Sequence, residues 1–259
     1  MFEQSKIKIK RANRHIGDLN TYITDVLVSQ LYFLSIEKNP QSGKAGLVCR
    51  MHSNETDIPV IVGDVAHNLR SAIDILYCDI LRHEGRKVDK HSKWPFRETR
   101  AELIVALNGR KPQAALSAGI VDLIISSIQT YRGGNGDALY SLHDLNIDDK
   151  HMLLLPTFNI SAVSGIEFVD ETGTVGSMNC SSYGGGGTCT FFGEGAQFRS
   201  EAATDIVEIK NHGKATFEVL FGKGAFYGQP IIPTLHQLSQ LVSATVDKVE
   251  KFLSPSGVT

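Results

Sequence analysis

Apolar residues recur every three or four positions in several stretches of the chain, which is the spacing of helices with one buried face. The first stretch runs from Ile16 to Leu31, and the best-marked one continues from Pro59 to a C-terminal stop at Gly85. Further helical stretches lie at about residues 98–108, 112–129 and 137–147, and a last one begins at Pro233. The pattern predicts a helical bundle to which the last helix returns.

Other stretches have the pattern of strands. Tyr32 to Glu37 and Ala45 to Met51 flank a turn-rich linker and predict a β-hairpin. After Pro156 the chain becomes rich in Gly, Thr, Ser and aromatic residues, and its short alternating runs indicate antiparallel strands. These runs lie at 188–192, 206–210 and 216–221.

Together these elements predict an α+β fold, in which a helical bundle packs against a segregated antiparallel β-sheet. We expect a mainly helical part over 1–155 with a small hairpin near 32–51, a glycine-rich β part over 156–233 and a closing helix over 234–253. A chain of 259 residues can bury the core of one integrated domain.

Composition narrows the classes of partner. The formal net charge is only −2, so no overall field attracts the chain to nucleic acid or to an anionic membrane. No apolar run approaches the roughly 20 residues of a membrane span or resembles a signal peptide, which predicts a cytoplasmic protein. The cysteines form no Cys-x-x-Cys pair, although Cys180 and Cys189 flank the glycine run 184–187 and could face each other across a hairpin.

Two polar clusters interrupt the apolar pattern and are the candidate site. In the segment 63–74, His67, Arg70 and Asp74 share one stripe of the predicted helix, with Arg70 and Asp74 at ion-pair spacing. In the segment 142–151, Asp149, Lys150 and His151 come where the helix ends. Carboxylates, imidazoles and cations are the groups from which acid–base, metal or phosphate sites are assembled.

A metal site is one interpretation. A mixed set of His and carboxylate ligands accepts zinc, manganese or iron. However, His67 and Asp74 are seven residues apart, which places them about 10 Å apart along a helix axis. The sequence therefore identifies neither a metal nor a cofactor.

A hydrolase or nuclease-like enzyme, either metal-independent or metal-assisted, is the function that the sequence favours. Arg70 or Lys150 would neutralise a phosphodiester or nucleotide, and His67 or His151 would transfer protons. Nucleases of the HEPN superfamily use an Arg–His couple in a helical bundle, but their Arg-x4–6-His spacing is absent around Arg70. The alternative is a non-catalytic module that binds a small anionic ligand, a nucleotide or a protein partner in the same polar pocket.

A purely structural role is equally compatible with these residues. Asp64 would cap the helix, Arg70 would bridge to Asp74 or Asp149, and the cluster would hold two helices in register. The distinction is geometric. Convergence of Arg70, Asp74 and His151 in an open cleft indicates a site, and sealed, fully paired groups indicate a scaffold.

The two clusters, in order with the Trp94-Pro95-Phe96 segment between them, resemble a family of uncharacterised bacterial and phage-associated proteins. The resemblance rests on Gly-Asp-x-x-His-Asn-Leu-Arg-Ser-Ala-Ile-Asp and Leu-Asn-x-x-Asp-Lys-His and covers about residues 58–155. It implies that His67, Arg70, Asp74, Asp149, Lys150 and His151 act together. It implies no reaction and no substrate.

Overall fold

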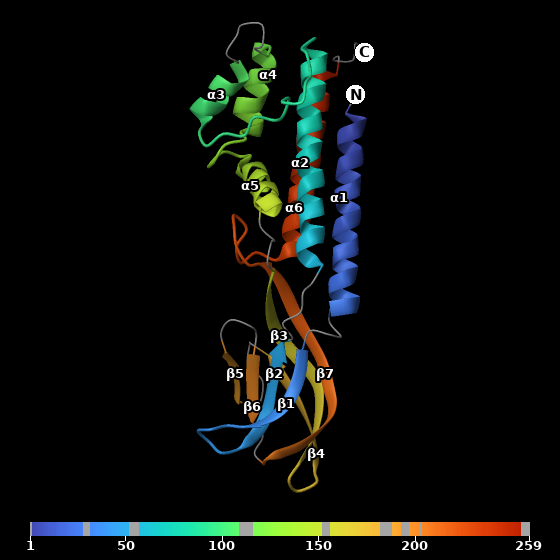
Figure 1. Ribbon diagram of the computed structural model, residues 1–259, viewed down its shortest axis with the longest axis vertical. Helices are drawn as coiled ribbons and strands as arrows, with labels where there is room; N and C mark the ends of the chain where they lie inside the picture. Colours follow the sequence, from blue (N-terminus) through green and yellow to red (C-terminus); the bar gives the residue numbers. More distant parts are fainter. Residues whose placement is uncertain are drawn as a thin grey trace. The chain divides into compact units, whose positions relative to one another are not determined.

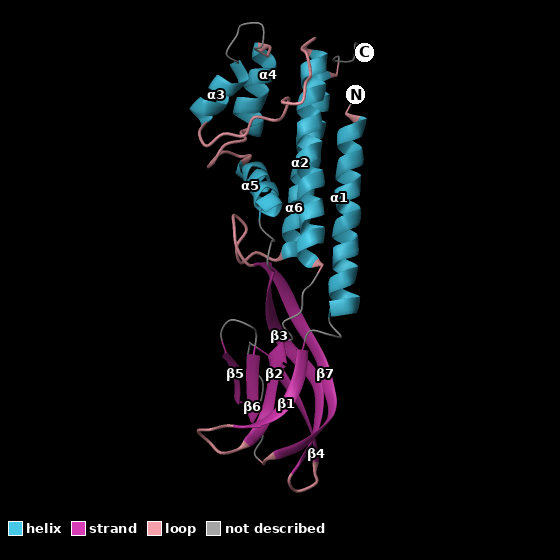
Figure 2. Cartoon of the chain, in the orientation of Figure 1, coloured by secondary structure: helices cyan, strands magenta, loops and turns pink. Residues whose placement is uncertain are grey.

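The computed structural model describes residues 2–27, 32–51, 57–108, 116–151, 156–181, 188–192, 197–201 and 204–254. The fold is α+β, as the sequence predicts, with helices and antiparallel strands in separate parts of the chain (Figures 1 and 2). Contacts divide it into two compact units. The helical unit comprises Met1–Leu19, Ile58–Leu155 and Lys223–Thr259, and the β unit comprises Asn20–Asp57 and Pro156–Gly222.

Three long helices lie side by side in the helical unit: α1 (Glu3–Thr21), α2 (Ile58–His83) and α6 (Ile231–Leu253) (Figure 1). Hydrogen bonds set their directions. The backbone nitrogen of Phe2 donates to Asp79 and the Ser5 hydroxyl donates to the carbonyl of Ala72, so α1 runs antiparallel to α2. Lys6 pairs with Glu250 at 2.7 Å. The predicted return of the last helix to the bundle is confirmed.

Helix α1 begins earlier than the apolar pattern predicts. The helix begins at Glu3, whereas the apolar pattern predicts a start at Ile16. Its buried face continues towards the N-terminus through Ile9 and the small residues Ser5 and Ala12, so large apolar residues mark it only in part. Beyond Thr21 the helix continues only as a π-helical stretch, η1 (Tyr22–Leu27), and the remaining positions of the predicted helix, 28–31, lie outside the described residues.

Helix α2 agrees with its prediction at both ends. It begins at Ile58, directly before Pro59, and Gly85 follows its end with a φ of 65°, a conformation that glycine adopts without strain. The nitrogen of Arg86 donates to the carbonyl of Leu81 at 2.7 Å and satisfies one of the last carbonyls of the helix. Asp64 lies inside α2, so the prediction that it caps this helix is wrong.

Shorter helices complete this unit. They are α3 (Arg100–Asn108), α4 (Ala118–Asp122), a π-helical stretch η3 (Leu123–Ile128) and α5 (Asp137–His151). Gln129 ends η3 in a left-handed conformation, with a φ of 59°. Helix α5 continues to His151, four residues past its predicted end. The polar residues 149–151 therefore belong to the last turn of this helix.

The β unit contains two antiparallel sheets, whereas the sequence predicts one. Strands β1 (Tyr32–Lys38) and β2 (Ala45–Met51) form the predicted hairpin, and β2 also pairs with β6 (Gln197–Glu201), which pairs with β5 (Thr188–Phe192). The other sheet has the order β4-β3-β7, with β3 (Pro156–Asp170), β4 (Val175–Ser181) and β7 (Ile206–Phe221). Residues of both sheets share one apolar cluster that includes Leu47, Cys49, Val163 and Ile166.

Two expectations for this unit change. The predicted strands 206–210 and 216–221 are parts of the single strand β7, whose pairing with β3 is interrupted by register shifts. Cys180 and Cys189 lie on β4 and β5, which belong to different sheets, so they do not face each other across a hairpin. The glycine run 184–187 lies outside the described residues. Within the described part, no helix is long and apolar enough to cross a membrane.

Candidate functional site

The six predicted site residues do not form one cluster. Arg70 and Asp74 lie together on α2, but His67, on the same helix, is exposed. Asp149 lies against Gly63, seven residues before Arg70 and so about 10 Å away along the α2 axis. Lys150 and His151 belong to the last turn of α5, and their side chains lie outside the described residues.

Arg70 is a buried cation with several partners. Its residue is only 5% exposed, and its guanidinium forms an ion pair with Asp74 one turn along α2. Burial lowers the pKa of Arg70, and the adjacent carboxylate of Asp74 opposes this change. The guanidinium carbon also lies 4.5 Å from the centroid of the Phe96 ring. The charge of Arg70 is therefore engaged within the protein.

Asp74 connects this ion pair to the segment that follows α2. Its Oδ1 atom accepts a hydrogen bond of 2.8 Å from the backbone nitrogen of Trp94. Trp94 is buried, and its indole nitrogen donates to the hydroxyl of Thr130 at 3.0 Å. The segment 94–96 is thus held from α2 by Asp74 and from the other side by Thr130.

His143 on α5 belongs to this cluster, although it is not among the predicted site residues. Its Nδ1 atom accepts a hydrogen bond of 3.2 Å from Nε of Arg70, so the neutral imidazole carries its proton on Nε2. Its ring stacks on Phe96 at 4.9 Å between centroids. No sequence signal links these partners, because Arg70 and His143 are 73 positions apart.

A second polar network lies next to the first. The hydroxyl of Tyr140 donates to Glu98 at 2.6 Å, and this hydrogen bond raises the pKa of Tyr140 to about 12. Arg132 donates to Glu98 at 3.0 Å and to Asp144 at 2.7 Å, and its guanidinium carbon lies 4.4 Å from the Tyr140 ring centroid. The same Tyr140 hydrogen bond holds the pKa of Glu98 below its usual range, while burial raises that of Asp144.

These contacts are suited to holding the segment 94–98 in place. Within the described ranges, no group of three or more His, Cys, Asp or Glu side chains could hold a metal ion, and the side chain of His151 lies outside those ranges. Arg70 is buried and paired with the partly exposed Asp74, and Asp149, on α5, lies against a different part of α2. The described part of the predicted site therefore has the geometry of a scaffold.

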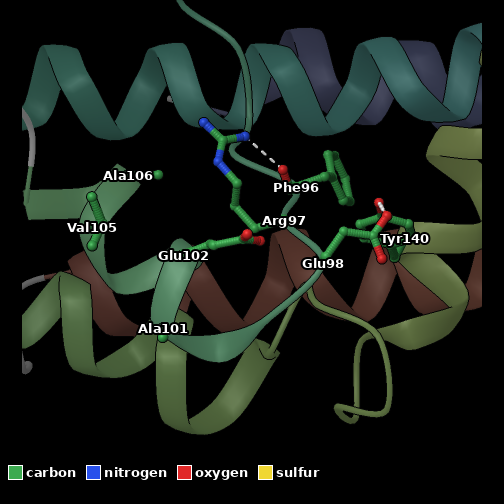
Figure 3. A pocket seen from close by; sticks show the side chains of 8 residues that line it. All are labelled: Phe96, Arg97, Glu98, Ala101, Glu102, Val105, Ala106 and Tyr140. Atoms are coloured by element: carbon green, nitrogen blue, oxygen red, sulfur yellow. Dashed lines mark hydrogen bonds between the residues drawn. The ribbon is translucent and has the colours of Figure 1, made fainter.

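The segment that this scaffold holds borders two hollows in the surface. The first, which we call the aromatic groove, has a volume of about 730 Å³ and is lined by Phe96, Tyr140 and one side of α3 (Figure 3). The second, which we call the basic hollow, has a volume of about 390 Å³ and is lined by Tyr77, His91, Lys93, Trp94 and other residues. Arg97 and Ala106 line both, so the two hollows adjoin.

Lys93 and Arg97 are the cations at the basic hollow. Both are exposed, and neither forms an ion pair with any described residue. One guanidinium nitrogen of Arg97 donates to the carbonyl of Phe96 at 2.6 Å, and Figure 3 shows the side chain extended away from Glu98. The carboxylate of Asp89 also lines the hollow, but it accepts hydrogen bonds from the His91 nitrogen and the Ser92 hydroxyl.

Tyr77 adds a polar group to the wall of the basic hollow. Its ring packs edge-on to Trp94, and its hydroxyl makes no hydrogen bond within the described part of the chain. Burial raises the pKa of Tyr77, and the positive charge of Arg97 acts in the opposite direction. The lining of the hollow thus includes two cations and a tyrosine.

Comparison of the chain with protein-family models, with curated proteins and with solved structures finds no match. The resemblance carried by the two sequence clusters stays a prediction.

Proposed function

We propose that the helical unit binds a small anionic ligand in the basic hollow, with Lys93 and Arg97 as the charged groups. The observation that carries this proposal is the pair of cations, without carboxylate partners among the described residues, at one hollow of about 390 Å³. A hollow of this size is within the range of small-molecule sites. The sequence predicts, as its alternative, a binding module that uses the polar clusters themselves; this proposal keeps the anionic ligand and assigns it to the neighbouring hollow.

In this proposal, Arg70, Asp74 and His143 are positioning residues. Asp74 holds the nitrogen of Trp94, and Arg70 and His143 pack on Phe96. Lys93 and Arg97 directly flank this fixed segment, so their backbone is ordered before a ligand arrives. Such preorganisation lowers the entropic cost of binding.

Isothermal titration calorimetry with ribose phosphate tests the proposal. We expect saturable binding that weakens as salt is added, because the contact is ionic. The double variant Lys93→Gln, Arg97→Gln should lose at least about tenfold in affinity, which is the equivalent of 1.4 kcal/mol. The matched control is Lys90→Gln, Arg100→Gln, which removes the same charge from exposed residues outside the described lining of the hollow. Equal losses in both variants, or absence of binding by the unaltered protein, would overturn the proposal.

Phosphodiester hydrolysis stays a second prediction, supported by the Arg70–His143 hydrogen bond of 3.2 Å. His143 would have to transfer a proton through Nε2 for the cluster to be catalytic. Release of product from a nucleotide or an oligonucleotide, abolished by His143→Gln and by His151→Ala in proteins of unchanged melting temperature, would support it. Membership of a bacterial or phage-associated family and a cytoplasmic location are likewise predictions from the sequence alone.

A further inference from the structure

We infer that the helical unit also binds a small aliphatic ammonium ion, in a pocket that shares no lining residue with the basic hollow or the aromatic groove. This pocket, which we call the acidic pocket, has a volume of about 300 Å³. It lies between α5, α6 and the loop 223–230 directly before α6. Its size is at the lower end of the range of small-molecule sites. The acidic pocket is thus a separate candidate site.

Helical spacing brings polar groups of α5 and α6 to this pocket. Asp137 and Ser141 are one turn apart on α5, and the α6 residues that line the pocket recur at three- and four-residue spacing. These α6 residues include Thr234, Gln237 and Leu241, and the two helices contact each other. Each helix therefore turns one face towards the same space.

Asp137 is the one charged residue in the described lining of the pocket. Its Oδ1 atom accepts a hydrogen bond of 3.1 Å from the nitrogen of Gly133, and its carboxylate forms no ion pair with any described residue. A carboxylate offers about four acceptor positions, so most of them stay open. The pocket thus carries a negative charge that a cationic ligand would neutralise.

Ser141 adds a buried hydroxyl to the wall of the pocket. The residue is 8% exposed, and its hydroxyl makes no hydrogen bond with any described residue. A serine inside a helix often bonds to the carbonyl four residues earlier, and buried polar groups are nearly always paired. A ligand with an N–H group would give this hydroxyl a partner.

The lining matches the donors and the chain of an alkylammonium ion. An ammonium group presents three N–H donors, for which the pocket offers the Asp137 carboxylate, the Ser141 hydroxyl and the carboxamide oxygen of Gln237. Ala138 and Leu241 add apolar surface that is not fully buried and can cover a short chain of methylene groups. A metal ion such as Ca²⁺ takes about six to eight oxygen ligands, whereas the described lining has one carboxylate. An organic cation therefore fits better.

NMR titration of the full chain with n-butylammonium chloride tests this site. The amide signals of α5 and α6 beside the pocket should shift in a saturable way, and the affinity should fall as salt is added. 1-Butanol has the same chain without the charge and should bind at least about tenfold more weakly, because charge-assisted hydrogen bonds are the stronger ones. Equal affinities for the two probes, or tighter binding of calcium chloride than of butylammonium, would overturn the inference.

Two variants assign the binding to the pocket. Asp137→Asn keeps an oxygen for the Gly133 nitrogen but removes the charge, and should weaken butylammonium binding at least about tenfold without changing that of 1-butanol. Ser141→Ala should also weaken butylammonium binding, without a loss of melting temperature, because the hydroxyl has no partner among the described residues.

The matched control is Asp247→Asn, which removes the same charge from an exposed residue of α6 outside the described lining of the pocket. This variant should bind butylammonium as the unaltered protein does. Equal losses in Asp137→Asn and Asp247→Asn, or unchanged binding in both Asp137→Asn and Ser141→Ala, would overturn the inference.

Discussion

One oxygen of Asp74 serves two partners: it accepts a hydrogen bond from the nitrogen of Trp94 at 2.8 Å and forms the ion pair with Arg70. Arg70 and Asp74 lie on α2, which ends at His83, and Trp94 lies on the segment that follows this helix. The polar stripe on α2 is therefore connected to the segment that borders both hollows. This relationship makes the stripe a support for the proposed site.

Removal of the Asp74 carboxylate should destabilise the helical unit. In Asp74→Ala, Arg70 remains a cation in a 5% exposed residue without its ion pair, and the nitrogen of Trp94 loses its acceptor. We expect a loss of about 2–4 kcal/mol in the free energy of unfolding, measured in urea, somewhat less than for a fully buried pair because Asp74 is partly exposed. Glu208→Ala breaks an exposed ion pair with Lys210 and should change little. Similar stabilities for the two variants would contradict the role of Asp74.

A side chain at Gly63 should displace Asp149. A Cβ atom there would clash with the carboxylate of Asp149, so Gly63→Ala should destabilise the protein by what this displacement costs, even though alanine favours helices. Gly17→Ala is the matched control, because Gly17 is an exposed position of α1 with nothing within 4 Å, and it should stabilise by about 0.5–1 kcal/mol. Thermal unfolding measures both. Asp149→Ala should relieve part of the Gly63→Ala defect, and simple additivity of the two changes would argue against the contact.

Alkaline pH should weaken the network around Tyr140. Its pKa is raised to about 12, whereas an unfolded tyrosine ionises near pH 10. Between these values the unfolded state has lost its proton and the native state has kept it, so this contribution to stability is complete below about pH 10 and is lost as the pH rises towards 12.

The ultraviolet absorbance of tyrosinate measures this ionisation. Tyr140→Phe should remove one late-ionising group from the titration. Glu98→Gln keeps an acceptor but removes the negative charge, and should move the pKa of Tyr140 back towards its usual value. If the group lost in Tyr140→Phe ionises near pH 10, and Glu98→Gln leaves the titration unchanged, Tyr140 does not have a raised pKa.

The sequence predicts a helix well where large apolar residues form its whole buried face and a glycine marks its end. Helix α2 has a continuous apolar face and a glycine stop, and both of its ends follow from them. The first half of α1 is missed because small residues such as Ser5 and Ala12 form part of its buried face. Strand β7 is predicted as two strands because the polar residues 211–214 interrupt the alternating pattern, whereas its pairing with β3 continues across them with register shifts.

Only part of the candidate site can be predicted from the sequence, because some of its contacts are local and others are made by the tertiary fold. The ion pair between Arg70 and Asp74 is local, and helical spacing predicts it. The partners His143 and Trp94 are brought to α2 by the tertiary fold, so spacing along the chain gives no indication of them. Lys93 and Arg97 are ordinary surface cations in the sequence. They become candidates only when the fold places them at one hollow without carboxylate partners among the described residues.

The most direct test of the account uses Trp94, the only tryptophan of the chain and part of the wall of the basic hollow. Its fluorescence should change in a saturable way as ribose phosphate is titrated into the protein, with one midpoint. The change should disappear in Lys93→Gln, Arg97→Gln and persist in Lys90→Gln, Arg100→Gln. A Trp94 signal that stays constant at saturating ribose phosphate, or that changes equally in the two double variants, would contradict an anion site on the segment that Asp74 and Arg70 hold.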